Sequence, residues 1–358
     1  MSKVMDNPLK PGKKFRVPTT VLGGDIAADG KQLFLGCMDG LYELNLNSGD
    51  SRKRDDHESY VSSVCSSANG QVISAGYDGG IQWWDSKTNQ RIRRVQAHAF
   101  WSWQMAISPD RKRIASVTGQ YIAGDYDYNP APEKEPSVKV LDAASGKVLH
   151  QFEHVPSVQA VAISPNNQFV AAGNLMGEVR VYDLNLNKQV AQWTTKDFTS
   201  WGIIKSHCNI GGIYDMQFSP DGDHLYVAGM GFMRDPMAGN GRQLWQKFAW
   251  REKAPKKVDE THKGESGEGL METLVMHPFN KHFIMAGRLR GGSWNAGLFE
   301  VESGKLVQSL KTGFRITQAV FDTSGEKLFL LGGQGQPRNK DGKFPKFGRI
   351  DCFDVQLG

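Results

Sequence analysis

Apolar and polar residues follow a pattern that recurs seven times along this chain. In each copy an apolar or weakly polar residue ends one segment, a polar turn follows, and a second apolar segment runs to a glycine. A strand, a tight turn, a second strand and a glycine are typical of a β-hairpin. The copies start at Ile26, Cys65, Ile107, Ile163, Phe218, Met276 and Phe321, and their glycines are Gly36, Gly76, Gly119, Gly173, Gly229, Gly287 and Gly332.

The spacing of the copies indicates a repeat architecture. Successive starts lie 39, 42, 56, 55, 58 and 45 residues apart. A hairpin that recurs at about 40 residues, with some longer intervals, favours a β-propeller over alternating strands and helices. A second landmark, a bulky residue followed by an acid or amide, keeps step with the first. It occurs at Leu44-Asn45, Trp84-Asp85, Leu141-Asp142, Tyr182-Asp183, Phe299-Glu300 and Phe353-Asp354.

The second copy, residues 77–85 (YDGGIQWWD), resembles the WD-repeat β-propeller family, whose blades carry Trp-Asp at the end of the third strand. The resemblance extends from about residue 21 to residue 355. It implies that a hydrogen-bonded tetrad locks the blade, and the matching residues are His57, Ser74, Asp78 and Trp84. Other blades lack parts of the tetrad, since the third has His98 and Ser116 but Leu141 in place of the tryptophan. The resemblance implies an architecture and leaves the function open.

We therefore predict an all-β fold, a seven-bladed β-propeller of four-stranded antiparallel blades that forms one domain over residues 13–358. The last blade is one strand short, because only residues 355–358 follow Phe353-Asp354. An open ring would leave unpaired strand edges. We expect residues 14–17 to close it as the outer strand of blade seven, where Pro18 is tolerated beside a free edge. Residues 1–12 are expected to form a flexible tail.

Composition restricts the classes of function. The chain has 358 residues and a formal net charge of +5, which is too modest to imply nucleic-acid binding by itself. No apolar run approaches the roughly 20 residues that span a bilayer. The first fifteen residues, MSKVMDNPLKPGKKF, hold no apolar stretch, so we expect no secretion signal and a cytoplasmic location. The cysteines show no paired spacing, and we expect Cys37, Cys65, Cys208 and Cys352 to be reduced and mostly buried.

Long insertions fall in loops that a propeller places on one face. When the strands of a blade are labelled a to d from the centre outward, the b–c loops and the d–a connections share a face, here called the insertion face. Residues 119–137, 230–242 and 334–348 lengthen b–c loops, and residues 194–212 and 256–270 lengthen d–a connections. Insertions on one face of a repeat protein often mark its binding face.

The insertions concentrate aromatic residues and charges. Aromatic and arginine side chains are the usual anchors of protein interfaces. Acidic residues gather in the loop of blade three and basic residues in those of blades six and seven, so an acidic and a basic side are expected. The alternative is that the aromatic residues pack among themselves and that the charges are solvated. The predicted partner-binding residues are Trp101, Tyr126, Trp201, Phe232, Arg290, Trp294, Arg338 and Lys346.

Motifs for catalysis, phosphate binding and zinc are absent from the sequence. His262 with residues 265–268 could hold a metal, but this segment reads more simply as a polar loop. We therefore predict a non-catalytic scaffold, without cofactor or metal, that binds a protein or peptide of unknown identity on the insertion face. One alternative is an enzyme or small-ligand binder at the channel mouth, because a scattered site escapes a motif search. A second is a nucleic-acid adaptor that uses the basic loop at residues 338–349.

Overall fold

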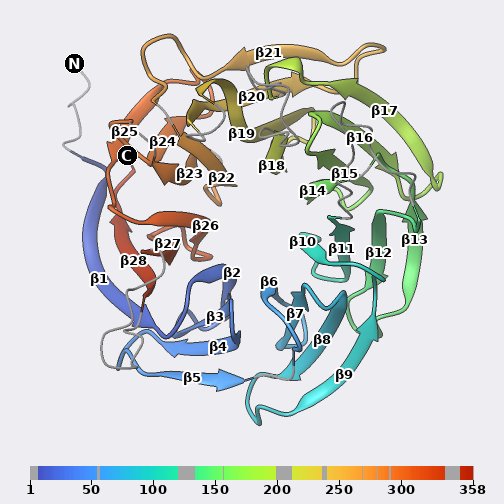
Figure 1. Ribbon diagram of the computed structural model, residues 1–358, viewed down its shortest axis with the longest axis vertical. Helices are drawn as coiled ribbons and strands as arrows, with labels where there is room; N and C mark the ends of the chain where they lie inside the picture. The colour runs from blue at the N-terminus through green and yellow to red at the C-terminus, as the bar shows by residue number, and fades with distance from the viewer. Residues whose placement is uncertain are drawn as a thin grey trace.

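Seven four-stranded β-sheets form a closed ring in this computed structural model (Figure 1). The structure describes residues 7–54, 57–119, 134–155, 157–198, 212–235, 240–267, 269–279, 281–289, 292–334 and 347–357. Neighbouring strands within each sheet run antiparallel. In the described ranges one short helical element is found, the 3₁₀ turn η1 (Lys196–Phe198). The predicted all-β, seven-bladed propeller is confirmed.

The first four blades each use four consecutive strands, ordered from the channel to the rim. Blade one holds β2 (Val21–Ile26), β3 (Gln32–Cys37), β4 (Gly40–Asn45) and β5 (Ser51–Arg54). Blade two holds β6 (Val61–Ser66), β7 (Gln71–Gly76), β8 (Gly80–Asp85) and β9 (Arg91–Gln96). Blade three holds β10 (Ser102–Ile107), β11 (Arg113–Thr118), β12 (Val138–Asp142) and β13 (Val148–Phe152). Blade four holds β14 (Val158–Ile163), β15 (Phe169–Asn174), β16 (Glu178–Asp183) and β17 (Lys188–Thr194).

Blades five and six follow the same order, and blade seven recruits its rim strand from the start of the chain. Blade five holds β18 (Gly212–Phe218), β19 (His224–Asp235), β20 (Asn240–Ala249) and β21 (Lys256–Glu260). Blade six holds β22 (Gly269–Met276), β23 (His282–Leu289), β24 (Ala296–Glu300) and β25 (Leu306–Leu310). Blade seven holds β26 (Arg315–Phe321), β27 (Lys327–Gly333), β28 (Gly348–Val355) and β1 (Leu9–Val17).

Strand β1 closes the ring, as the sequence predicts, but it is longer than expected. It pairs with β28 from Leu9 opposite Val355 to Val17 opposite Gly348. The first four residues of β1 therefore belong to the sheet and not to a tail. Leu9 is buried in the core of blades six and seven, and its N–H donates to Gln308 Oε1 at 2.8 Å. Burial and this hydrogen bond explain why the strand begins so early.

Two predicted insertions are shorter in the structure. Residues 256–260 form β21, the rim strand of blade five, and not part of a loop. Strand β19 extends to Asp235, and β20 begins at Asn240. Much of the predicted 230–242 loop is therefore an extended hairpin. In both places backbone pairing with a neighbouring strand uses residues that the sequence pattern assigns to a connection.

The recurring polar turn is held by a serine hydroxyl. Oγ of Ser108, Ser164 and Ser219 accepts the backbone N–H five residues later, at 2.9, 2.8 and 2.9 Å. The same hydroxyl donates to the Asp110 or Asn166 side chain two residues on, at 2.6 Å. Such local hydrogen bonds fix the backbone of a turn. They explain why this part of the repeat is the most visible in the sequence.

Apolar side chains fill the space between neighbouring sheets. Trp250, which follows β20, meets Phe169 of blade four edge-on, with ring centroids 5.0 Å apart. Trp245 of blade five meets Phe283 of blade six in the same way at 5.2 Å. Both tryptophans are almost fully buried. The core is therefore a ring of blade-to-blade contacts that surrounds an open centre.

Candidate functional site

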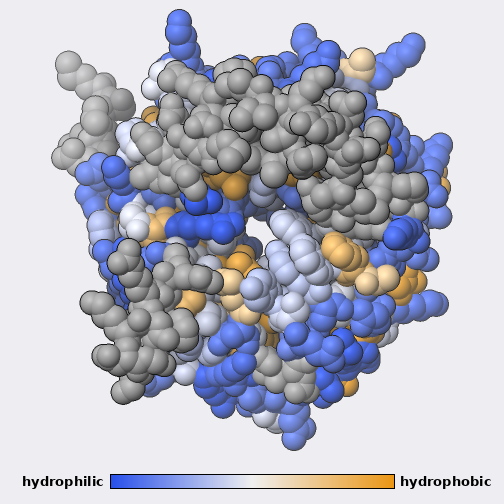
Figure 2. Space-filling model, viewed as in Figure 1, coloured by the Kyte–Doolittle hydropathy of each residue, from blue (hydrophilic) through white to orange (hydrophobic). Residues whose placement is uncertain are grey.

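A cavity of about 690 Å³ occupies the centre of the ring. The innermost strands of all seven blades line it, and Figure 2 shows the molecule hollowed there. Side chains from seven sequence-distant segments thus converge on one space. Because each innermost strand runs from the insertion face to the opposite face, the cavity has a mouth on the insertion face.

Every innermost strand carries a β-bulge near its start, which lies at that mouth. In blade three the pairing slips between Ser102 and Gln104, and in blade five between Ile213 and Asp215. A bulge turns the extra side chain away from the regular alternation of the strand. Here it presents one side chain from each blade to the cavity. These are Leu22, Ser62, Trp103, Gln159, Tyr214, Glu272 and Thr317.

The bulged residue Glu272 forms an ion pair with Arg315, the first residue of β26. Arg315 donates from Nε and Nη2 to the two carboxylate oxygens of Glu272, both at 2.7 Å. The Glu272 side chain is nearly buried, and Arg315 is about half-exposed. The hydrogen bonds to Glu272 raise the pKa of Arg315. Burial raises the pKa of Tyr77 and of Tyr214 to about 12, so both phenols are neutral at physiological pH.

Five aromatic residues form a stacked group beside the mouth, here called the aromatic cluster: Tyr60, Tyr77, Phe100, Trp101 and Trp103. Tyr77 stacks on Trp101 with centroids 4.9 Å apart and on Trp103 at 5.5 Å. Phe100 stacks on Trp101 at 4.8 Å, and Tyr60 tilts against Tyr77 at 5.7 Å. Tyr60 and Trp101 are 41% and 39% exposed. The cluster therefore offers rigid aromatic surface next to the charged pair.

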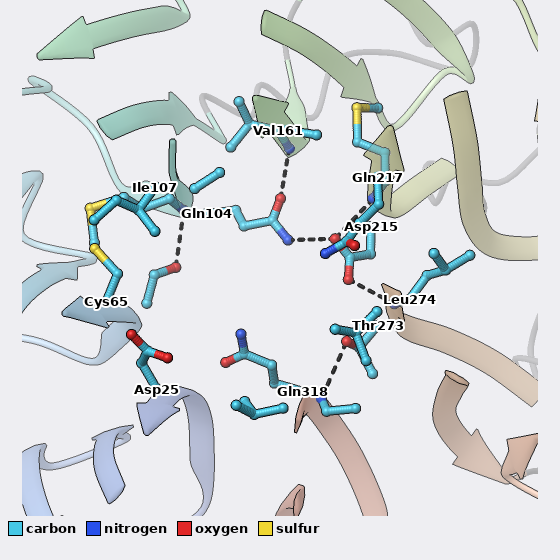
Figure 3. Close-up of a pocket in the computed structure, with 18 of the residues that line it drawn as sticks. Asp25, Cys65, Gln104, Ile107, Val161, Asp215, Gln217, Thr273, Leu274 and Gln318 are labelled. Carbon is cyan, nitrogen blue, oxygen red and sulfur yellow. Dashed lines mark hydrogen bonds between the residues drawn. The ribbon is translucent and has the colours of Figure 1, made fainter. Parts of the chain in front are cut away.

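Below the mouth, hydrogen bonds connect the blades (Figure 3). The residue after the bulge uses its side chain to accept a backbone N–H from the next blade. Such bonds join Val161 to Gln104 Oε1 at 2.7 Å and Leu274 to Asp215 Oδ2 at 2.7 Å. Equivalent bonds link Met105 to Ser63, Ala319 to Thr273 and Gly24 to Gln318. Five of the seven blade junctions share this arrangement.

Blade four lacks a polar side chain at the equivalent position, Ala160, and Gln104 compensates for it. Its Nε2 atom donates to Asp215 Oδ1 at 3.1 Å, which joins blade three to blade five directly (Figure 3). Asp215 is partly buried in the cavity wall, and desolvation there raises its pKa to about 6. Burial also raises the pKa of Asp25, which faces the cavity from blade one. The cavity thus holds two carboxyl groups in unlike surroundings.

The four tetrad residues of blade two lie in one hydrogen-bonded chain. His57 Nδ1 is 3.1 Å from Asp78 Oδ2, and His57 Nε2 is 2.9 Å from Ser74 Oγ. Trp84 Nε1 donates to the same Ser74 hydroxyl at 3.0 Å. Burial opposes ionisation of Asp78, but its bond to His57 prevails and lowers its pKa to about 2. The Ser74 hydroxyl of strand b therefore connects His57, which precedes strand a, to Trp84 of strand c.

Blade three keeps part of this arrangement. His98 Nε2 is 3.0 Å from Ser116 Oγ, and Ser102 Oγ is 2.9 Å from the same hydroxyl. Burial lowers the pKa of His98 to about 4. Leu141, which replaces the tryptophan, packs in the core between blades two and three. The repeat is thus degenerate at the level of its hydrogen bonds while the blade geometry is retained.

A family model for the WD domain, G-beta repeat, matches residues 51–85. These residues hold all four tetrad side chains, and the ring around them has seven blades of the corresponding form. The chain is a seven-bladed β-propeller with a WD repeat at residues 51–85. Its other blades follow the same topology with fewer of the family's side chains.

Similar proteins match parts of this WD-repeat chain. Telomerase protein component 1 of Mus musculus is 25% identical over 167 residues, which is 46% of this chain and 6% of that protein. THO complex subunit 6 of Drosophila melanogaster is 37% identical over 68 residues, 18% of this chain and 19% of that protein. The serine-threonine kinase receptor-associated protein of Mus musculus is 22% identical over 208 residues, 57% of this chain and 51% of that protein. The chain thus spans about half or less of the relatives it matches.

The predicted anchors of this WD-repeat protein have different positions. Trp101 is exposed in the aromatic cluster. Trp294 is 5% exposed and packs against Phe299 in the core of blades five and six, so it is not available as a surface anchor. Phe232 lies on β19, but its side chain is outside the described part of the chain. The remaining predicted anchors, Tyr126, Trp201, Arg290, Arg338 and Lys346, lie outside the described residues.

Sequence reasoning missed the cavity residues, because a bulge is a property of strand pairing. Gln104, Asp215 and Gln318 are polar residues inside apolar strands, and this is the one signal that could have found them.

The described cysteines Cys37, Cys65 and Cys352 are buried and free, whereas Cys208 lies outside the described residues. No group of three or more metal-binding side chains occurs in the described part. No helix found there is long and apolar enough to cross a membrane.

Proposed function

We propose that this protein is a non-catalytic scaffold that binds a protein or peptide partner on its insertion face, beside the channel mouth. The exposed aromatic cluster carries the proposal. Tyr and Trp side chains dominate protein interfaces, because they supply large contact areas at a low cost in conformational entropy. The WD repeat at residues 51–85 and the similarity to WD-repeat proteins support an interaction function. Two relatives are, by name, a complex subunit and a receptor-associated protein.

Rigidity favours the aromatic cluster as an anchor. Tyr77 and Trp103 both line the cavity, and Trp101 stacks on Tyr77 and lies 6.2 Å from Trp103, centroid to centroid. The exposed rings are therefore supported from below and lose little freedom when a partner docks. The Glu272–Arg315 pair next to them offers a charged group of each sign. A partner that combines an apolar anchor with a polar flank fits this surface.

The other predicted anchors extend the same proposed surface. Phe232, Tyr126 and Trp201 would add apolar contacts, while Arg290, Arg338 and Lys346 would attract acidic groups. Charges at the rim of an interface act mainly on the rate of association. We assign them this role in the proposal and keep the aromatic cluster as its centre.

A displayed peptide library selected on the intact protein tests the proposal. Peptides that bind wild type should bind a Trp101→Ala variant at least about 30-fold more weakly, which corresponds to about 2 kcal/mol for an aromatic anchor. Phe279→Ala is the matched control, because Phe279 is 65% exposed and belongs to the turn after β22, on the opposite face. Binding by isothermal calorimetry and melting by circular dichroism are compared for all three proteins. Equal binding by Trp101→Ala with an intact fold would refute the proposed surface.

A small-ligand site in the central cavity is the second candidate. It is favoured by the cavity of about 690 Å³ and by two partly buried carboxyl groups that line it, Asp25 and Asp215. Ligand sites are concave and combine apolar walls with a few placed polar groups. A thermal-shift screen with small cationic and neutral metabolites tests it, and ligands that stabilise wild type should not stabilise Gln104→Ala. Nucleic-acid binding through the loop of blade seven and a cytoplasmic location both stay predictions.

A further inference from the structure

Ten lysine and arginine residues lie on three neighbouring rim strands, and we call this group the basic belt. Figure 1 shows β1, β5 and β9 following one another as an arc along the outside of blades seven, one and two. These three strands contain no acidic residue. The belt consists of Lys10, Lys13, Lys14 and Arg16 on β1, Arg52, Lys53 and Arg54 on β5, and Arg91, Arg93 and Arg94 on β9.

Protection of strand edges does not explain the belt. Charged residues on an edge strand prevent edge-to-edge association, and every blade of the ring has such an edge. The rim strands of blades three and six, β13 (VLHQF) and β25 (LVQSL), nevertheless carry no lysine or arginine. The rim strand of blade five, β21 (KKVDE), carries as many acids as bases. The positive charge is therefore concentrated on one side of the rim.

Belt residues also cross the boundaries between blades. Lys13 Nζ donates to the carbonyls of Leu46 and Asn47 in the turn of blade one, at 3.4 and 3.5 Å. Arg54 donates to the carbonyls of Asp85 and Ser86 in the turn of blade two, at 3.1 and 2.9 Å. Lys13 is exposed at the first junction, whereas Arg54 is buried at the second and is also paired with Glu43. Basic residues of the belt thus bridge two blade junctions.

Carboxylates neutralise part of the belt. Glu43 accepts hydrogen bonds from Arg52 and Arg54, and Asp78 is 3.6 Å from Arg94. Asp50 precedes β5, and two further acids follow it at residues 55–56. Asp354 and Asp351 of β28 lie opposite Lys10 and Lys14, but they form ion pairs with Lys327 and Arg349. The five acids named before them are half as many as the ten basic residues of the belt. Seven of its side chains are exposed, namely Lys13, Lys14, Arg16, Arg52, Lys53, Arg91 and Arg94.

We propose that the basic belt binds the phosphate backbone of a single-stranded nucleic acid that wraps around the rim. The belt is long, one strand wide and convex, so its ligand has to be a flexible chain of anions. Duplex DNA, with a persistence length of about 50 nm, bends too stiffly to follow this arc. Arginine forms paired hydrogen bonds with phosphate oxygens. Because the contacts are to phosphates, RNA and DNA oligomers should bind alike, with little sequence preference.

Fluorescence anisotropy with the full chain tests the proposal. The probes are labelled oligouridylate and oligothymidylate of about 20 nucleotides, a length that spans several contacts. The belt variant combines Lys14→Gln, Lys53→Gln and Arg91→Gln. The control variant combines Lys188→Gln, Lys253→Gln and Lys256→Gln, which removes the same charge from exposed positions of blades four and five. Circular dichroism melts establish that both variants are folded.

Wild type and the control variant should bind both oligomers, with log Kd rising steeply with log salt concentration. Each lost phosphate contact lowers the slope by about 0.7, so the belt variant should lose about 2 in slope and on the order of 100-fold in affinity near 0.1 M salt. No binding by wild type at about 50 mM salt would overturn the proposal. Equal losses in both variants would do so as well. Belt-dependent binding of polyglutamate or of phosphatidylserine vesicles, without binding of oligomers, would assign the belt to another partner.

Discussion

At the residue scale, single side chains in the channel connect whole blades. Gln104 accepts from Val161 of blade four and donates to Asp215 of blade five, so one amide spans three blades. Asp215 in turn accepts from Leu274 of blade six. A buried carboxylate surrounded by donors rigidifies a structure, while its desolvation works against ionisation. The balance of these two effects makes Asp215 the residue at which pH should act on the fold.

The stability of the protein should depend on pH through Asp215. Its pKa is raised from 3.8 to about 6 in the folded state, so the folded state holds this proton more tightly than the unfolded chain does. The stabilising contribution of the protonated carboxyl is complete below pH 3.8 and is lost as pH rises through about 6. Asp215→Asn removes this dependence and loses hydrogen bonds equally at every pH. Melting temperatures of both proteins should be measured from pH 4 to 8. The melting temperature of the variant minus that of wild type should rise between about pH 4 and 6 and stay constant above pH 6. A difference that is independent of pH would contradict the assignment.

At the element scale, the hairpins could be predicted because their signals are local. A serine hydroxyl and an Asp or Asn within six residues hold the turn between Ile107 and Ile114, and the sequence displays that pattern directly. Blade two departs from it, because its turn is one residue shorter. The N–H of Ser67 donates to the carbonyl of Gln71, four residues later, whereas in blade three the N–H of Ser108 donates to the carbonyl of Arg113, five residues later. Hence Ser66, and not Cys65, pairs with Val72. Bulges and the burial of Trp294 depend on distant strands and leave no comparable local signal.

The early start of β1 could not be predicted for a related reason. Its first residues, LKPG, include a proline and a glycine, which disfavour strands when judged locally. They pair with residues more than three hundred positions away, and Pro11 is tolerated because β1 is a rim strand. The tertiary environment, chiefly the pocket that buries Leu9, overrides local propensity here.

Removal of β1 should destabilise the ring strongly. A deletion of residues 1–17 takes away the buried side chains of Leu9, Phe15 and Val17 and exposes the edge of β28. Burial of each such side chain contributes about 1.5–3 kcal/mol, so the loss is comparable to the whole stability of a typical domain. A deletion of residues 1–6 is the control, since it leaves β1 complete. Urea unfolding and light scattering should report a much lower midpoint and aggregation for the longer deletion alone. Equal midpoints for both deletions would show that β1 does not hold the ring closed.

At the scale of the whole molecule, the ring separates two proposed surfaces. The aromatic cluster lies on the insertion face at the channel mouth of blades two and three. The basic belt follows the rim of blades seven, one and two. They come nearest at blade two, where Arg94 lies 3.6 Å from the tetrad residue Asp78. Elsewhere intervening strands of the same sheets separate them. With both proposed surfaces occupied, such a ring would hold two partners side by side without conformational change.

Binding at the two surfaces should therefore be independent. Sites that share no contacts usually contribute additively, within about 0.5 kcal/mol. The affinity of a peptide selected on the insertion face should change less than about twofold when an oligonucleotide saturates the belt, and the reverse should hold by linkage. Trp101→Ala should leave oligonucleotide binding unchanged, and the triple belt variant should leave peptide binding unchanged. Calorimetric titrations of each ligand, with and without the other, measure both directions. Mutual displacement would mean that the two ligands compete for one surface, and Arg94 at blade two would be the first position to examine.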